Sequence, residues 1–168
     1  NMTDQFAAPS ILTNTTGAEG KEAKEALVLF YDKWKNEALV VDKWLSVQAA
    51  CRLPGTLAGV QRLVGHEAFD LSNPNKVYAL LRTFGANHRH FHAKDGSGYH
   101  FLAEQIALLD PMNPQVASRM ARCFDRWKKF DQARQQHARA ALEKLHAING
   151  LSNDVFEVVD KALGAGGK

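Results

Sequence analysis

The stretches Asn73-Pro74-Asn75-Lys76-Val77 and Asn113-Pro114-Gln115-Val116 decide the fold of this chain. In each, an asparagine that can cap a helix precedes a proline, whose missing N–H costs nothing at the first helical position. Asn113 follows Asn73 by 40 residues, and Ser152, a third plausible cap, follows Asn113 by 39. A repeat of about 40 residues with two helices per unit is typical of HEAT and armadillo proteins. The spacing therefore predicts stacked helix pairs.

Between these starts, apolar residues recur every three or four positions, as on one face of a helix. The stripes are Leu27, Phe30, Tyr31 and Trp34; Val77, Leu80, Leu81 and Phe84; Val116, Met120, Cys123, Phe124 and Trp127; and Ala138, Ala141, Leu142, Leu145 and Ile148. The one candidate strand, residues 88–92, is mostly polar. We predict an all-α fold in which stacked antiparallel helix pairs form a HEAT/armadillo-like superhelix.

The expected helices form a single helical-repeat domain over residues 1–163, followed by a frayed, glycine-rich tail over residues 164–168. Their ranges are 4–12, 18–36, 38–51, 55–64, 74–86, 97–109, 114–128, 131–148 and 153–163. Because one helix pair cannot bury its apolar face alone, neighbouring pairs must stack to build a continuous core.

The composition excludes several classes of protein. The chain has 168 residues, 45% of them apolar and 23% charged, and a formal net charge of +3. These values exclude a collagen-like chain, a disordered tail and a disulfide scaffold. No apolar run is long enough to span a bilayer, no secretory signal opens the chain, and Cys51 and Cys123 lie far apart. We therefore expect reduced thiols, a cytoplasmic location and no membrane partner.

Four histidines form the first candidate for chemistry. His88, His90 and His92 alternate, with His100 nearby, and imidazoles at this spacing could share a transition metal. A complete site would also need acidic or thiolate partners, and only Asp95 lies close in sequence. A polar loop between helices is the simpler interpretation, so we expect no metal and no cofactor in this chain.

Two further stretches resemble catalytic or phosphate-binding motifs only in part. His66-Glu67-Ala68-Phe69-Asp70 has Asp70 where a zinc-binding H-E-x-x-H motif needs its second histidine. Lys94-Asp95-Gly96-Ser97-Gly98 lacks the spacing of a phosphate-binding loop, and Asp95 or Ser97 is expected to cap the next helix. The sequence therefore contains no complete catalytic apparatus.

Basic residues are concentrated in residues 113–147, which hold eight Lys and Arg against three Asp and Glu. A basic face on a helical repeat could bind nucleic acid or acidic protein partners. These charges are spread around two helices, which favours a solvated outer face, so we expect no nucleic-acid partner. Arg119 stands apart because it precedes the expected core residue Met120 and could flank a groove.

Several stretches, in order along almost the whole chain, resemble one family. They are Asn1-Met2-Thr3-Asp4; Tyr31-Asp32-Lys33-Trp34; Leu39-Val40-Val41-Asp42-Lys43-Trp44; Ser72-Asn73-Pro74-Asn75; Phe91-His92-Ala93-Lys94-Asp95-Gly96-Ser97-Gly98-Tyr99; and Asn113-Pro114-Gln115-Val116-Ala117-Ser118-Arg119. The chain is similar to the C-terminal domain of the bacterial aminopeptidase N family, the zinc-dependent gluzincin aminopeptidases.

The resemblance implies a helical, non-catalytic C-terminal domain of a longer enzyme that hydrolyses N-terminal residues from peptides. In that family the zinc and the H-E-x-x-H motif belong to a catalytic domain of the same polypeptide, which this domain covers, closing the substrate cavity. The chain alone should therefore be inactive. Arg119 matches a cavity-facing arginine of the family, and His92, Asp95 and Tyr99 lie in a matching loop near the cavity. A free-standing helical-repeat scaffold that binds protein or nucleic acid through a basic face is the alternative.

Overall fold

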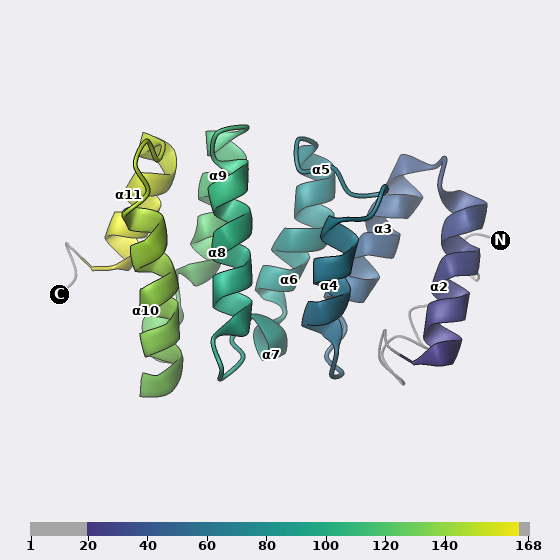
Figure 1. Ribbon diagram of the computed structural model, residues 1–168, viewed down its shortest axis with the longest axis horizontal. Coiled ribbons are helices and arrows are strands. Elements are labelled where there is room, and N and C mark those ends of the chain that lie inside the picture. Colours follow the sequence, from purple (N-terminus) through teal and green to yellow (C-terminus); the bar gives the residue numbers. More distant parts are fainter. Residues whose placement is uncertain (1–19, 165–168) are drawn as a thin grey trace. The chain divides into compact units, whose positions relative to one another are not determined.

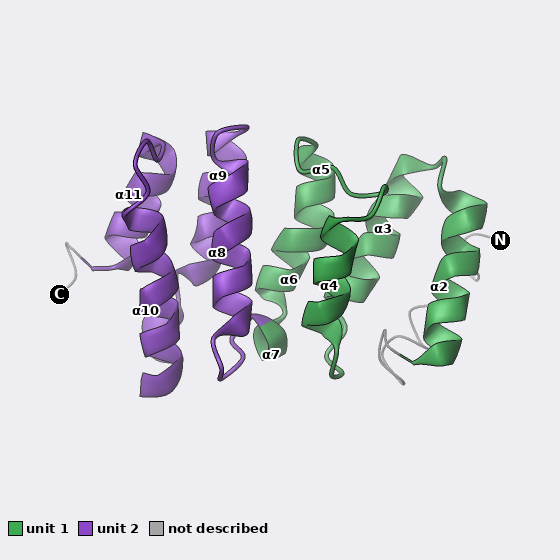
Figure 2. Cartoon of the chain, in the orientation of Figure 1, with its two compact units in different colours: residues 1–90 green, residues 91–168 purple. Residues whose placement is uncertain are grey.

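The structure is a computed structural model that describes residues 20–164, and every regular element among these residues is helical (Figure 1). The predicted all-α class is confirmed. The expected helix 4–12, the Asn1–Asp4 motif and residues 165–168 of the expected tail lie outside the described residues. The chain divides into two compact units, residues 1–90 and residues 91–168 (Figure 2).

Over residues 20–90, the described part of the first unit, the chain forms three α-helices and a longer helix of mixed geometry. Its elements are α2 (Lys21–Trp34), α3 (Ala38–Ala49), α4 (Thr56–Val64), α5 (Pro74–Val77), a π-helical stretch (Tyr78–Arg82) and α6 (Thr83–Ala86). The last three are continuous, so the expected helix over residues 74–86 has the predicted ends. It begins where predicted because the Asn73 side chain accepts a hydrogen bond from the Asn75 N–H, with Pro74 at the first helical position.

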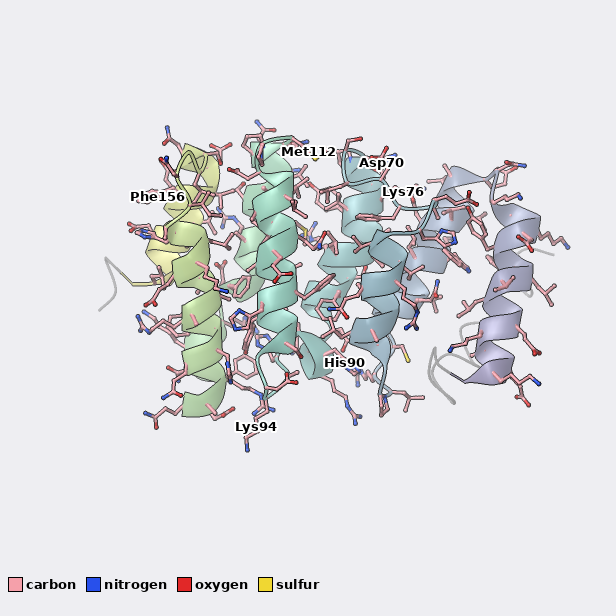
Figure 3. The ribbon with its side chains drawn as sticks, in the orientation of Figure 1. Asp70, Lys76, His90, Lys94, Met112 and Phe156 are labelled. Atoms are coloured by element: carbon pink, nitrogen blue, oxygen red, sulfur yellow. The ribbon has the colours of Figure 1, made fainter. Side chains whose placement is uncertain are left out.

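The helices of the first unit are tied together through α3. The Trp44 indole N–H donates to the Leu27 carbonyl at 2.9 Å, which joins α3 to α2. Lys76, labelled in Figure 3, donates to the Asp42 carboxylate at 2.5 Å and to the Ala38 carbonyl at 3.2 Å, which joins α5 to α3. Because both charged side chains are largely buried, removing either one would leave an uncompensated charge.

A π-helical turn interrupts the helix over residues 74–86, a feature that the apolar stripe did not predict. The Thr83 hydroxyl donates back to the Tyr78 carbonyl at 3.3 Å, five residues earlier, as the wider turn allows. The Ser46 hydroxyl of α3 lies 3.0 Å from the Ala79 carbonyl within the same turn. π-helical geometry usually occurs as a single turn of this kind inside an α-helix, and here the Tyr78 and Ala79 carbonyls accept hydrogen bonds from side chains.

The second unit contains a short helical turn followed by two helix pairs. Its elements are α7 (His88–Phe91), which begins in the last residues of the first unit, α8 (Ser97–Leu109), α9 (Pro114–Ala121), two 3₁₀ turns (Arg122–Phe124 and Trp127–Lys129), α10 (Gln132–His146) and α11 (Asn153–Ala162). Helix α8 packs on α9 and α10, and α11 packs on α9 and α10.

Two hydrogen-bonded contacts join distant parts of the second unit. The Trp127 indole N–H donates to the Ala162 carbonyl at 2.8 Å, which fixes the end of α11. The buried Asp110 carboxylate, at the end of α8, accepts the Ser152 N–H at 2.9 Å and the Ser152 hydroxyl at 2.5 Å. Ser152 in turn caps α11, since its side chain accepts from the Val155 N–H. Asn113 caps α9 in the same way, so the predicted caps are confirmed.

Two sequence-based expectations were wrong in detail. The helix expected over residues 114–128 ends at Ala121, and 3₁₀ turns carry the chain onward. Phe124 and Trp127 are nevertheless buried, because a spacing of three residues suits a 3₁₀ turn as well as an α-helix. Residues 88–91, considered as a strand or a polar loop, form the helical turn α7, whose Phe91 is fully buried.

Candidate functional site

The loop between α7 and α8, together with the first turn of α8, carries three of the four predicted site residues, and two of them are in contact. The His92 ring nitrogen Nδ1 lies 2.6 Å from the Tyr99 hydroxyl. His92 is 4% exposed and Tyr99 is fully buried. Tyr99 belongs to the first turn of α8, so this hydrogen bond fastens the start of the loop to the helix that follows it.

Residues from α10 and the segment before it hold His92 from the other side. The His92 ring stacks on the Phe130 ring, with centroids 3.8 Å apart and planes 16° from parallel. The Arg134 Nε donates to the His92 carbonyl at 2.6 Å, while Arg134 Nη1 donates to the Asp131 carboxylate at 2.6 Å. The Phe130 ring and the Tyr99 phenol therefore hold the His92 imidazole, and the Arg134 guanidinium holds the His92 backbone carbonyl.

Burial sets the protonation state of the phenol in this cluster. Desolvation raises the pKa of Tyr99 to about 12, with the nearby Arg134 charge lowering it and the Asp131 charge raising it by smaller amounts. Tyr99 therefore keeps its proton at neutral pH. A neutral phenol of this kind can donate to an imidazole nitrogen, so the hydrogen bond needs no charged partner.

Asp95 holds the turn before α8. Its Oδ1 accepts the Ser97 N–H at 2.9 Å and the Ser97 hydroxyl at 2.6 Å, and these two bonds lower the pKa of the Asp95 carboxyl. The N-cap residue is Gly96, so the prediction that Asp95 or Ser97 occupies this position was wrong, although the Asp95 side chain does accept the N–H of the first helical residue, Ser97. The intervening Gly96 has a φ of +78°, and a Cβ added there would lie 2.4 Å from Cγ of His137. The turn therefore needs a glycine both for its backbone conformation and for its contact with α10.

Arg119 lies on a different element and is placed differently from the three loop residues. It is an exposed residue near the end of α9, directly before the fully buried Met120. Because α9 anchors its neighbours Met120 and Ala117 in the core, the guanidinium extends from a fixed helix. Of the four predicted site residues, Arg119 and Asp95 are exposed, and the Asp95 carboxylate already accepts two hydrogen bonds from Ser97.

The residues that clamp His92 were not identified from the sequence. Arg134 was assigned with its basic neighbours to a solvated outer face, but it is only partly exposed and is bonded to the backbone 42 residues earlier. The other basic residues of that region are exposed, as expected. No local pattern marks Arg134, since its role depends on which residues of α10 face the loop.

The stretch that partly resembles a zinc-binding motif has a structural role in the first unit. Glu67 accepts a hydrogen bond from the Tyr31 hydroxyl at 3.0 Å, and burial followed by this bond raises the pKa of Tyr31. His66 packs edge-on against the Tyr31 ring and accepts the Ala68 N–H through Nδ1 at 2.9 Å. His66 and Glu67 therefore hold the turn after α4 in place through these contacts.

The histidines around α7 do not form a metal centre within residues 20–164, where no group of three or more His, Cys, Asp or Glu residues could hold a metal ion. Side chains two residues apart project to opposite sides of a helical turn, whereas the metal hypothesis required an extended segment. Within this same range, no helix has both the length and the apolar character needed to cross a bilayer.

Comparisons with known proteins show the family. The family model described as a domain of unknown function, DUF3458_C, with ARM repeats matches residues 1–164. Aminopeptidase N of Escherichia coli is 43% identical over 165 residues, and aminopeptidase N of Haemophilus influenzae is 39% identical over 166 residues. Each alignment covers 97% of this chain and 18% of the relative, so the chain spans under a fifth of the length of these proteins.

A solved structure agrees with the sequence relatives. The crystal structure of Legionella pneumophila aminopeptidase A in complex with aspartic acid is similar, with a TM-score of 0.89 and 38% sequence identity. That likeness covers 97% of this chain and 19% of the aminopeptidase A chain. The chain therefore belongs to the DUF3458_C family and is a non-catalytic ARM-repeat C-terminal domain of the aminopeptidase N type.

Proposed function

We propose that this chain closes the substrate cavity of a zinc aminopeptidase, over a catalytic domain of the same polypeptide. The observation that carries the proposal is the near-complete coverage of this chain by aminopeptidase N relatives of which it spans only 18%. In such an enzyme the reaction would be the removal of N-terminal residues from peptides. We further propose that the two units act together as one domain, since one family model spans residues 1–164, and that the enzyme is cytoplasmic.

The zinc of the proposed enzyme would be held outside this chain, because the described residues offer no group of ligands that fits it. When bound in the catalytic domain, it would supply a metal-activated water. The part of this chain would be to cover the site, exclude bulk water and limit access to short, flexible peptides. The chain alone would be inactive.

Exposed apolar side chains support a role as a covering domain. In the first unit, Leu39 is 76% exposed and Leu29 is 71% exposed, and in the second unit Leu108 is 60% exposed. Val28 extends the exposed apolar surface beside Leu29 on α2. Apolar surface of this kind is often covered by a partner, here the remainder of the polypeptide. If so, a catalytic portion supplied as a separate chain should bind this chain.

Arg119 is the residue of this chain that we propose to contact substrate. Its planar guanidinium can pair with the C-terminal carboxylate or a backbone carbonyl of an enclosed peptide. His92, Asp95 and Tyr99 would act indirectly by keeping the adjoining loop rigid, since their polar groups already bond within the domain.

The test is Arg119→Ala in the full-length aminopeptidase. Turnover of peptides that end in a free carboxylate should fall about tenfold, the effect of losing one charge-assisted hydrogen bond. Hydrolysis of an aminoacyl anilide, which has no such carboxylate, should not change. Arg126→Ala removes another exposed arginine of the second unit and serves as the control. Unchanged kinetics on peptides of several lengths would refute the role of Arg119.

Nucleic acid is not the partner that we propose. Two of the basic side chains in residues 113–147 already have partners: Arg134 bonds Asp131, and Arg139 lies over the Trp127 ring at 5.0 Å. A nucleic-acid surface would show binding that falls steeply with salt concentration. Salt-dependent binding of this chain to single-stranded or duplex probes would favour the scaffold function instead.

A further inference from the structure

A basic pocket in the first unit has no role in the function proposed above. It has a volume of about 620 Å³ and lies where two helices end, after Ala49 in α3 and after Ala86 in α6. Arg52, His88 and Arg89 contribute exposed basic side chains to its wall, and no acidic residue lines it. Among the described residues, neither Arg52 nor Arg89 forms an ion pair.

One residue that lines the pocket, Asn87, has an unsatisfied hydrogen-bond acceptor. Asn87 is 7% exposed, and its amide nitrogen donates to the Ala49 carbonyl at 3.0 Å and to the Cys51 carbonyl at 2.8 Å. These two bonds fix the orientation of the amide, because the opposite orientation would place its oxygen against two carbonyl oxygens. The Asn87 Oδ1 is buried and accepts no hydrogen bond from any described residue.

An unsatisfied buried acceptor is unfavourable, so a ligand that brings an N–H group to it gains free energy. Arg89 is exposed and lines the same pocket as Asn87. The pocket therefore offers two kinds of contact at once. The guanidinium groups of Arg52 and Arg89 can bind a planar anion through paired N–H donors, and Asn87 can accept a proton donor from the same ligand.

The helix ends help to decide which anion fits. The C-terminal end of a helix carries partial negative charge, which disfavours a compact, multiply charged anion such as phosphate. A carboxylate carries a single charge and matches the guanidinium fork. An N–H group on the carbon next to the carboxylate could then donate to an acceptor such as Asn87 Oδ1.

We propose that the pocket formed by Arg52, Arg89 and Asn87 binds a carboxylate whose neighbouring carbon bears an N–H donor. Peptide C-termini and free α-amino acids both have this chemistry. The inference does not depend on cavity closure, because the pocket belongs to this chain alone. The competing explanation is that the two arginines only complement the helix ends and bind nothing.

The experiment titrates the 168-residue chain with Ala-Ala-Ala, L-alanine, Ala-Ala-Ala amide and inorganic phosphate, by calorimetry and by NMR shifts of the Asn87 side-chain amide. Saturable binding of Ala-Ala-Ala, with the C-terminal amide about tenfold or more weaker, is expected from the loss of a charge-assisted pair. Binding of the tripeptide but not of L-alanine would identify the ligand as a peptide C-terminus. Binding of both would include free amino acids.

Substitutions of the two pocket arginines, with a control substitution elsewhere in the first unit, test where the ligand binds. Arg52→Gln and Arg89→Gln should each weaken Ala-Ala-Ala binding about tenfold, while Arg62→Gln, an exposed arginine of α4 that lines a different pocket, should leave it unchanged. A depsipeptide with an ester in place of the last amide tests the Asn87 contact and should bind more weakly. Absence of saturable binding, equal binding of phosphate or the amide, or equal loss in Arg62→Gln would overturn the proposal.

Discussion

The turn before α8 makes a quantitative prediction, because Gly96 is restricted by backbone conformation and by packing at the same time. Gly96→Ala places an L-residue at a φ of +78° and a Cβ 2.4 Å from Cγ of His137. The left-handed conformation costs roughly 1–2 kcal/mol, partly offset by about 0.4–1 kcal/mol because alanine restricts the unfolded chain. The overlap with the imidazole forces α10 or the loop to shift, which adds roughly 1–3 kcal/mol. The expected loss of unfolding free energy is therefore about 1–5 kcal/mol, centred near 3 kcal/mol.

Gly150 provides a matched control in the same unit. Its φ is +86°, and a Cβ added there would meet nothing within 4 Å. Gly150→Ala should therefore lose only the backbone contribution, roughly 1 kcal/mol or less. Urea unfolding followed by far-ultraviolet circular dichroism gives both values, and the difference between them isolates the contact with His137. Equal losses in the two variants would refute the packing argument.

A double variant tests the same contact independently. In the His137→Ala background the ring is gone, so Gly96→Ala should cost no more than the control substitution Gly150→Ala. The interaction free energy from the four proteins should then be about 1–3 kcal/mol. An interaction near zero would mean that the loop moves away from α10 without cost.

Three further predictions concern buried polar contacts of the second unit. Asp110→Asn should lower the unfolding free energy by about 2 kcal/mol in urea titrations, because the Ser152 N–H and hydroxyl lose a charged acceptor; an unchanged midpoint would contradict this. Tyr99→Phe should cost roughly 1–3 kcal/mol by leaving Nδ1 of the buried His92 without the phenol, and a cost under about 0.5 kcal/mol would show that the bond is not needed. Absorbance at 295 nm should show one tyrosine ionising with a pKa of about 12. Since this pKa is above the unfolded value near 10, its stabilising effect is complete below about pH 10 and is lost as pH rises through about 12, so unfolding free energies that rise over that interval would contradict the assignment.

Helix existence and helix starts could be predicted from the sequence because their causes are local. Asn113 and Ser152 cap α9 and α11 with their own side chains, so a few consecutive residues carry all the information. Helix α8 has the predicted ends at residues 97 and 109, since the loop before it is closed by its own Asp95. Elements specified within one turn of chain are those that sequence reasoning describes well.

Geometry that depends on distant neighbours could not be predicted. The α9 stripe continues through Phe124 and Trp127, and its spacing suits an α-helix or 3₁₀ turns equally well. The bond from Trp127 to Ala162 fixes where that side chain points, 35 residues away in sequence. The π-turn at residues 78–82 likewise has a partner in Ser46 of another helix. Such choices are made by tertiary contacts, which a local pattern does not contain.

In the candidate site, too, some residues are explained by their own contacts within the domain and others are not. This difference decides which residues are available to contact a ligand. The stretch from Phe91 to Tyr99 resembles a family motif, but the contacts made by its polar residues explain why those residues stand there. The His92 ring bonds Tyr99, the Asp95 carboxylate bonds Ser97 at the start of α8, and Gly96 leaves room for the ring of His137. This stretch can therefore resemble the family motif because its residues build one rigid loop, without any of them contacting a ligand. Arg119 differs, since its guanidinium is exposed on α9 beside the buried Met120. If Arg119 contacts substrate, Arg119→Ala should lower peptide turnover and cost less unfolding free energy than Tyr99→Phe. Tyr99→Phe should lower the unfolding free energy and leave peptide turnover unchanged at moderate temperature.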